Sequence, residues 1–108
     1  MKNLKEIIEK NDLANTGAEF VVMTHSKTEY EQMRDIIFEV GFHFIVFNPE
    51  VTEREAMDDL AKDYNYEGGW RISWGRGVAF NPDIKHWHEY NYTILETKET
   101  GKLGKVDY

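Results

Sequence analysis

The apolar run at residues 20–23 constrains the fold more than any other feature of this sequence. Phe20, Val21, Val22 and Met23 follow one another without a polar residue. Such a run is too short for a helix and too continuous for a strand that has one face in water. It is typical of a strand in the middle of a sheet, covered on both faces. Other elements must therefore pack above and below it.

The segment after this strand predicts a helix with both of its ends marked. Ser26 with Glu29 three residues later forms a capping box, and Gly41 suits the left-handed position that ends many helices. The apolar residues between these signals recur at helical spacing: Tyr30, Met33, Ile36, Ile37 and Val40. We therefore expect one continuous helix here.

A second apolar run covers residues 42–47 and ends at Asn48 and Pro49. Because this run is rich in aromatic and β-branched residues, it predicts another strand. Strand, helix and strand would then follow one another with short connections, for which a right-handed parallel crossover is the favoured geometry. The sequence therefore predicts a β-α-β unit.

The second half of the chain predicts mostly strands. Residues 70–80 are expected to form a hairpin, because apolar and polar residues alternate on both sides of a glycine-rich turn. Pro82 is expected to open a short helix over residues 84–89, with an extended segment that places Ile84, His86 and His88 on one side as the alternative. Residues 90–97 alternate again and predict the strand that closes the sheet.

Together with an amphipathic helix at residues 2–10, these elements predict an α/β (α+β) fold. We expect a small mixed sheet of four to five strands with about three helices, including the β-α-β unit and a C-terminal antiparallel hairpin. Residues 1–97 are expected to form a single domain. Residues 98–108 are rich in Gly, Lys and Thr and are expected to form a flexible tail.

The composition excludes several classes of function. A hydrophobic content of 41% argues against disorder, and the lack of cysteine excludes disulfides and thiolate zinc sites. The net charge of −7 opposes direct binding to nucleic acid or to anionic lipid. Residues 1–10 lack the apolar core of a signal peptide. We therefore expect a cytoplasmic protein that does not enter a membrane.

An acidic block at residues 50–67 contains seven carboxylates and only two cations, so it supplies five of the seven net negative charges. Thr52 with Glu55 forms a capping box, and an apolar stripe at helical spacing follows, so the block predicts a helix. The opposite side of that helix would be either a solvated face or a docking surface for a basic protein. The expected docking residues are Glu50, Glu55, Asp58, Asp59, Asp63 and Glu67.

A second group of residues predicts a different kind of site. Tryptophan faces can stack on bases and guanidinium groups can bind phosphate, so a nucleotide pocket is the alternative. Its expected residues are Trp70, Arg71, Trp74, Arg76 and Trp87. However, the alternation at residues 70–74 is explained equally by one buried face of a strand, which is the more common role of such tryptophans.

The remaining candidates for chemistry are weaker. His86 and His88 would point the same way on a strand and give half of a metal site, with His25, His43 or a carboxylate as a third ligand. On a helix the two rings would diverge instead. Ser26 is expected to cap a helix and lacks the surroundings of a nucleophile. We therefore expect no metal, no cofactor and no enzymatic activity.

Residues 20–96 resemble small accessory proteins of phages and prophages of Gram-positive bacteria. The likeness rests on the order of a strand, a Glu-rich helix ending at Gly, an aromatic strand, and a final aromatic stretch, which is "EYNYTILE" in this chain. In its length, acidity and lack of cysteine the chain is also similar in character to anti-CRISPR and other anti-defence proteins. This resemblance implies an inhibitor that blocks the nucleic-acid groove of a nuclease.

Three hypotheses follow from the sequence. The first is a non-enzymatic inhibitor whose acidic helix takes the place of phosphates against a basic groove. The second is a module that binds a nucleotide or another small ligand through the Trp and Arg residues. The third is a homo-oligomer whose interface includes Tyr90 and Tyr92.

Overall fold

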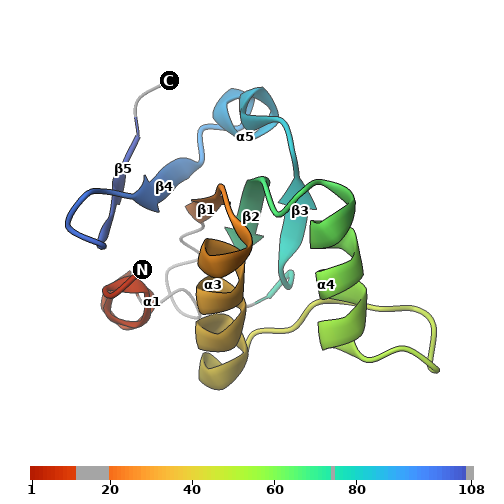
Figure 1. Cartoon of the computed structure of the whole chain (residues 1–108). Coiled ribbons are helices and arrows are strands. Elements are labelled where there is room, and N and C mark those ends of the chain that lie inside the picture. Colours follow the sequence, from red (N-terminus) through yellow and green to blue (C-terminus); the bar gives the residue numbers. More distant parts are fainter. Residues whose placement is uncertain (12–19, 74, 107–108) are drawn as a thin grey trace.

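The computed structural model describes residues 1–11, 20–73 and 75–106. Nine elements lie in these residues (Figure 1), and they alternate between helices and strands along most of the chain. In chain order they are α1 (Leu4–Asn11), β1 (Phe20–Thr24), α3 (Lys27–Val40), α4 (Glu53–Asp63), β2 (Gly68–Ile72), β3 (Ala79–Asn81), α5 (Ile84–Glu89), β4 (Thr93–Thr97) and β5 (Leu103–Lys105). The result is a mixed α+β fold, as the sequence predicted.

The five strands form one mixed sheet in the order β3-β2-β1-β4-β5. The central strand β1 pairs antiparallel with β2 and parallel with β4, and the two outer pairs are antiparallel. At the centre of the sheet Val22 lies opposite Trp70 on one side and opposite Leu95 on the other. The two antiparallel pairs at the edges include the expected hairpin within residues 70–80.

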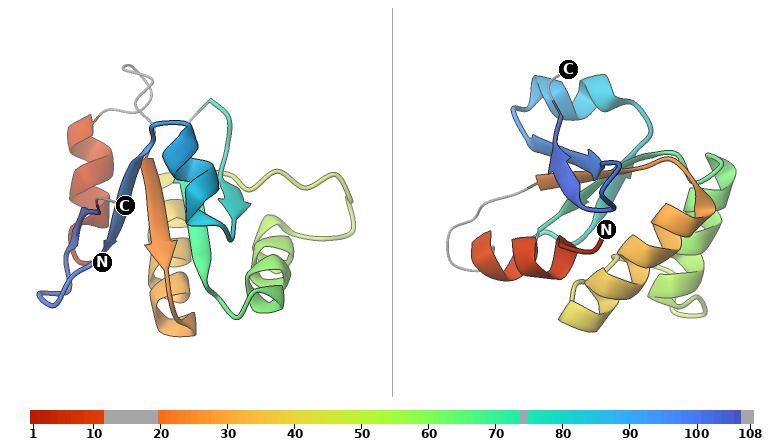
Figure 2. Two further views of the ribbon diagram at one scale, coloured as in Figure 1. Left: turned by 90° about the horizontal axis from the view of Figure 1, so that it is seen from above. Right: turned by 60° about the vertical axis from the view of Figure 1, so that its left-hand side comes forward.

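Strand β1 is buried along its whole length, which confirms the central strand predicted from residues 20–23. Because successive side chains of a strand point to opposite faces, Phe20 and Val22 join the core under α1, α3 and α4. Val21 and Met23 join a smaller core under α5. Figure 2 shows α5 on one side of the sheet and the other three helices on the opposite side.

The predicted helix signals act as expected. The hydroxyl oxygen of Ser26 accepts a hydrogen bond from the Glu29 N–H, and Gly41 has a φ of 112° at the end of α3. The hydroxyl oxygen of Thr52 accepts a hydrogen bond from the Glu55 N–H at the start of α4. Asp83 caps α5 in the same way through the Lys85 N–H. The short helix over residues 84–89 is therefore confirmed, and the extended alternative is wrong.

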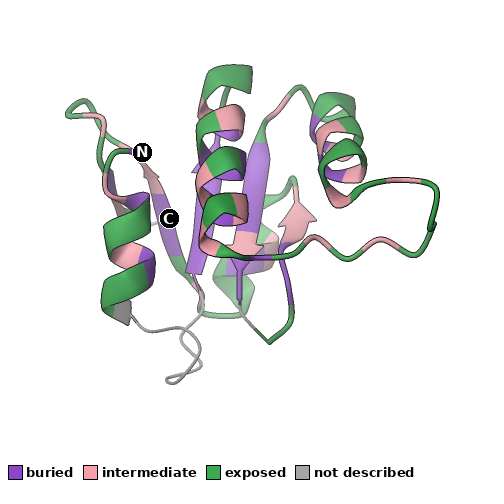
Figure 3. Cartoon of the chain, turned by 90° about the horizontal axis from the view of Figure 1, so that it is seen from below, coloured by how far each residue is buried: buried purple, intermediate pink, exposed green. Residues whose placement is uncertain are grey.

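The strand predicted at residues 42–47 is wrong, because this segment is irregular. Both edges of β1 are occupied by β2 and β4, so the parallel partner of β1 comes from the far end of the chain. Within this segment Phe42 is buried, whereas the side chains of Ile45 and Phe47 are exposed. Figure 3 shows it as part of a long loop that extends from the body of the molecule.

The strand β5 lies inside the segment that was expected to be a flexible tail. Leu103 is buried in the main core, and its backbone N–H donates to the side chain of Asn3 at 2.7 Å. The Met1 ammonium donates a hydrogen bond to the Gly101 carbonyl oxygen at 2.8 Å. The hairpin of β4 and β5 is thus held against the start of the chain, and β5 rather than β4 closes this edge of the sheet.

Candidate functional site

The outer side of α4 carries a row of exposed carboxylates. Glu55, Asp59 and Asp63 are spaced four residues apart, so they lie one above another on the helix. Glu50 is exposed in the connection that leads into the same helix. Within the described part of the chain none of these four carboxylates forms a hydrogen bond or an ion pair. We call Glu50, Glu55, Asp59 and Asp63 the acidic surface.

Asp58 does not belong to this surface, although the sequence placed it there. Its Oδ1 accepts hydrogen bonds from the Tyr30 hydroxyl at 2.6 Å and from the Arg34 guanidinium at 3.1 Å. Both donors are buried side chains of α3. Asp58 follows Met57, which is fully buried, so its position on the helix turns it toward α3 rather than outward. Asp58 therefore fastens α4 to α3.

The contacts of Asp58 change the proton affinity of its two partners. Burial and then the hydrogen bond to Asp58 raise the pKa of the Tyr30 hydroxyl well above its usual range, so Tyr30 stays protonated as a donor. Burial alone would lower the pKa of Arg34, but the hydrogen bonds to Asp35 and Asp58 raise it above its ordinary value. These two donors therefore remain in their bonding forms at neutral pH.

Glu67 is paired with His25, so we do not include it in the acidic surface. Its carboxylate lies 3.5 Å from Nδ1 of His25, and Nε2 of the same ring lies 3.2 Å from Glu96. The other histidine that the sequence considered as a ligand, His43, contacts Glu53 at 3.2 Å. His43 is thus paired with the first residue of α4, and His25 is paired with Glu67, which precedes β2, and with Glu96 on β4.

The tryptophans of the predicted nucleotide pocket are buried where the structure describes them. Trp70 has no exposed surface, and its indole N–H donates to the Thr24 hydroxyl at 3.1 Å. Its ring packs against Phe80 at 4.3 Å between centroids. Trp87 is 4% exposed and lies in the small core under α5. Neither ring can stack on a base, so this part of the alternative site is wrong.

Of the other members of that alternative site, Arg71 has its contacts within the hairpin. The guanidinium of Arg71 lies 3.4 Å from the carbonyl oxygens of Arg76 and Gly77, so it supports the turn of the hairpin. Arg76 is exposed in that turn. Trp74 lies outside the described residues. Among the described members of this set, Trp70 and Trp87 therefore lie in two different cores and Arg71 contacts a turn, so these three do not surround one ligand position.

His86 and His88 both lie on α5, so their rings diverge around the helix. The ring of His86 contacts Trp87 and Tyr90 at 4.7 and 5.1 Å between centroids. Among the residues that the structure describes, no group of three or more His, Cys, Asp or Glu side chains is arranged to hold a metal ion.

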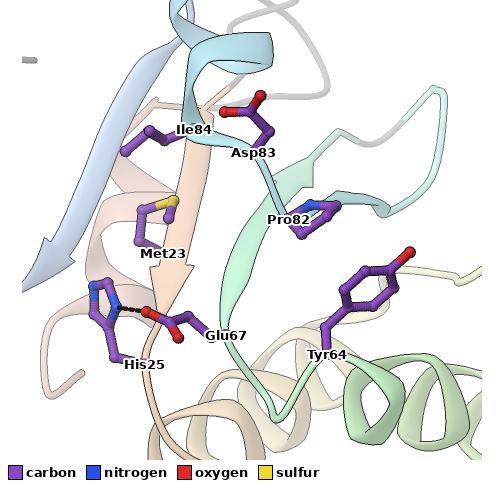
Figure 4. A pocket seen from close by; sticks show the side chains of 7 residues that line it. All are labelled: Met23, His25, Tyr64, Glu67, Pro82, Asp83 and Ile84. Atoms are coloured by element: carbon purple, nitrogen blue, oxygen red, sulfur yellow. Dashed lines mark ion pairs between the residues drawn. The ribbon is translucent and has the colours of Figure 1, made fainter.

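A pocket of about 430 Å³ opens where β1 ends. Figure 4 shows His25 and Glu67 at one end of the pocket and Pro82 and Tyr64 at the other. Met23 lies between the pair of His25 and Glu67 and the start of α5. The lining contains the carboxylates of Glu67 and Asp83 and the imidazole of His25, which are hydrogen-bonding groups. Because the His25 ring contacts carboxylates on both of its nitrogens, it is not paired with a nucleophile.

Sequence reasoning missed the aromatic residue that is most exposed among those the structure describes. Phe47 is 95% exposed and Ile45 is 58% exposed, both in the loop of residues 41–52. Their hydrophobicity predicted a buried strand, and the only sequence signal for a loop was the Asn48-Pro49 pair that follows. The Asn48 side chain accepts a hydrogen bond from the Glu50 N–H at 3.0 Å, which makes a local turn there.

Comparisons with protein-family models, with curated proteins and with solved structures found no match. The candidate site therefore depends on the geometry alone. Among the helices that the structure describes, none combines the length and the apolar character needed to cross a membrane.

Proposed function

We propose that this protein is a non-enzymatic inhibitor that binds another protein through the acidic surface. The partner would be a nucleic-acid-binding protein whose basic groove is occupied by this surface. One observation carries the proposal: Glu55, Asp59 and Asp63 form an exposed row without partners among the described residues. A positively charged groove is the complement of such a row, and charge complementarity accelerates encounter and selects the partner.

The row costs stability within the chain itself. Like charges four residues apart destabilise a helix by roughly 0.2–0.5 kcal/mol for each pair. Asp63 is also the last residue of α4, where the helix dipole disfavours a negative charge. A basic partner would turn both of these unfavourable effects into attraction. This supports a role in binding over a role in folding.

The spacing of the carboxylates supports competition by charge rather than imitation of each phosphate. Four residues of α-helix rise about 6 Å, whereas phosphates of one DNA strand follow at about 3.4 Å along the axis. The row therefore presents fewer charges per length than DNA does. The rigid setting of α4 offsets this, because Met57 and Ala61 are buried and Asp58 is bonded to α3.

The test is recovery of partners from a lysate of the source cells, followed by titration of the purified partner. The native chain is compared with a variant that carries Glu55→Lys, Asp59→Lys and Asp63→Lys. We expect the native chain to bind a basic nucleic-acid-binding protein and to displace nucleic acid from it. The affinity should fall steeply as the salt concentration rises from about 50 to 200 mM, because exposed charges are screened.

The matched control carries Glu6→Lys, Glu9→Lys and Glu99→Lys, three exposed carboxylates outside the acidic surface. Both variants change the net charge by the same amount, so only the position of the charge differs. The control should bind like the native chain. Equal binding by the two variants, or an affinity that does not change with salt, would reject the proposed function.

A further inference from the structure

The loop of residues 41–52 presents an apolar tip in water. Phe47 is 95% exposed and Ile45, two residues earlier, is 58% exposed. Figures 1 and 3 show the loop running outward from the end of α3 and returning to the start of α4. Single exposed apolar residues are ordinary on a surface, but an almost fully exposed Phe on a projecting loop is suited to contact with another molecule.

The loop is fixed at several points in its length. The His43 carbonyl oxygen accepts a hydrogen bond from the Val78 N–H at 2.8 Å. Ile45 lies against Gly77, where an added Cβ would be 3.3 Å from its Cγ1. Nearer the tip, the Val51 N–H donates to the Asn48 carbonyl oxygen at 3.2 Å. A loop held in this way loses little conformational entropy on binding, so its tip is arranged in advance.

The surroundings of the tip indicate which partner it suits. Glu50 follows Phe47 by three residues, and Glu55 lies in the first turn of α4, which the loop enters. Both carboxylates belong to the acidic surface, so the apolar tip stands at its border. Anionic lipid would be repelled by these charges. A protein pocket that is apolar inside and basic at its rim would complement both features at once.

We propose that Phe47 is the apolar anchor of the interface, inserted into such a pocket of the protein partner. This inference rests on the proposed function, because the acidic surface supplies the basic character of the rim. Once inserted, Phe47 would act as a binding hot spot, an aromatic side chain that is buried in a pocket of the partner and shielded from water by its neighbours. Ile45 would cover the side of the pocket that faces the β2–β3 turn.

The experiment places the photo-crosslinking residue p-benzoylphenylalanine at position 47 or, as a control, at Tyr90. Tyr90 is also an exposed aromatic residue, at 64%, but it follows α5 on the opposite side of the sheet. Irradiation in a lysate of the source cells should link position 47, and not position 90, to one identified protein. The absence of a product specific to position 47 would overturn the inference.

The identified protein is then purified and titrated with the native chain, Phe47→Ala and Tyr90→Ala. We expect Phe47→Ala to weaken binding by about 30-fold or more without changing the dependence on salt, and Tyr90→Ala to change it by less than about 3-fold. Because Phe47 and Tyr90 are both exposed, the two variants should have the same urea midpoint of unfolding as the native chain. An unchanged affinity for Phe47→Ala would overturn the inference.

The outcomes separate this inference from the proposed function. If Phe47→Ala binds normally while the lysine variant of α4 fails to bind, the acidic surface is the interface and Phe47 is not its anchor. If the affinity of the native chain does not change with salt and Phe47→Ala abolishes binding, the proposed function fails and the aromatic contact remains. Two further results would overturn the role of Phe47 as the anchor. The first is that the native chain, but not Phe47→Ala, floats with phosphatidylcholine–phosphatidylglycerol vesicles. The second is that the native chain forms a homodimer and Phe47→Ala dissociates it.

Discussion

Asp58 and Asp59 are neighbours in the chain, yet we expect their removal to have very different effects on stability. Replacing either residue with alanine makes the same change in helix propensity, so the comparison isolates the contacts. Asp58→Ala takes the hydrogen-bond acceptor away from the Tyr30 hydroxyl and from the Arg34 guanidinium. Asp59→Ala removes a carboxylate that has no bond to any described residue.

The magnitude follows from what each partner keeps. Tyr30 is 1% exposed, so its hydroxyl loses a charged acceptor and gains little access to water, which costs about 1–3 kcal/mol. Arg34 retains Asp35 at 2.9 Å, which limits its loss. The side chain of Asp58 is 37% exposed, so a value in the middle of this range is reasonable. We expect Asp58→Ala to destabilise the fold by about 2 kcal/mol. Asp59→Ala should leave the stability unchanged or raise it by up to about 1 kcal/mol, because it removes the like-charge pairs with Glu55 and Asp63.

Urea unfolding followed by tryptophan fluorescence measures this difference, because Trp70 lies against Tyr30 in the core. A difference of about 2 kcal/mol moves the midpoint by about 1 M urea for a domain of this size. If the two variants unfold within about 0.5 kcal/mol of each other, the assignment of Asp58 to the contact between α3 and α4 is refuted. Binding tests on the acidic surface should therefore leave Asp58 unchanged.

Three further predictions concern other parts of the structure. The raised pKa of Tyr30 means that above about pH 10 the unfolded chain loses this proton and the folded chain keeps it. As the pH rises above this value, the native chain should therefore lose up to about 1.4 kcal/mol of its free energy of unfolding per pH unit more than the Tyr30→Phe variant loses. Urea unfolding at several pH values measures this loss, and an equal loss in the two proteins would contradict the prediction. Gly69→Ala would place a Cβ 2.5 Å from the Trp87 indole and should lower the free energy of unfolding by about 1–3 kcal/mol. Gly75→Ala would add a Cβ in open space and should be near neutral. Equal melting temperatures for the two variants would disprove the close contact. Leu103→Ala should cost about 2–3 kcal/mol and Lys102→Ala less than about 0.5 kcal/mol, and a small effect of both in thermal unfolding would mean that β5 adds little to the fold.

The elements that the sequence predicted correctly are those with local signals. The buried run at residues 20–23 and the two capping boxes need only neighbouring residues to be recognised, and the structure places each where the pattern indicated. Residues 42–47 were predicted wrongly because their hydrophobicity says nothing about which strands occupy the two edges of β1. Strand β5 was missed because a short edge strand with one buried residue, Leu103, leaves almost no pattern.

The candidate site was predictable only in part, for a related reason. Helical spacing indicates that Glu55, Asp59 and Asp63 share one side of α4, and this is where the structure has them. Asp58 lies at the border of that side, so its environment depends on where α3 packs, which spacing cannot tell. Alternation placed Trp70 on one face of a strand and favoured the burial of that face, and the structure buries the side chain completely.

The parallel pairing of β1 with β4 has a consequence for how the chain folds. Phe20 lies opposite Thr93 in the register, so the two strands that make the middle of the sheet come from distant parts of the chain. Contacts between distant segments slow folding, because a long loop must close before the pairing gives any stability. During synthesis one edge of the apolar strand β1 has no neighbour until residues 93–97 have left the ribosome. In this interval the free edge of β1 is open to aggregation, so the arrival of β4 protects β1.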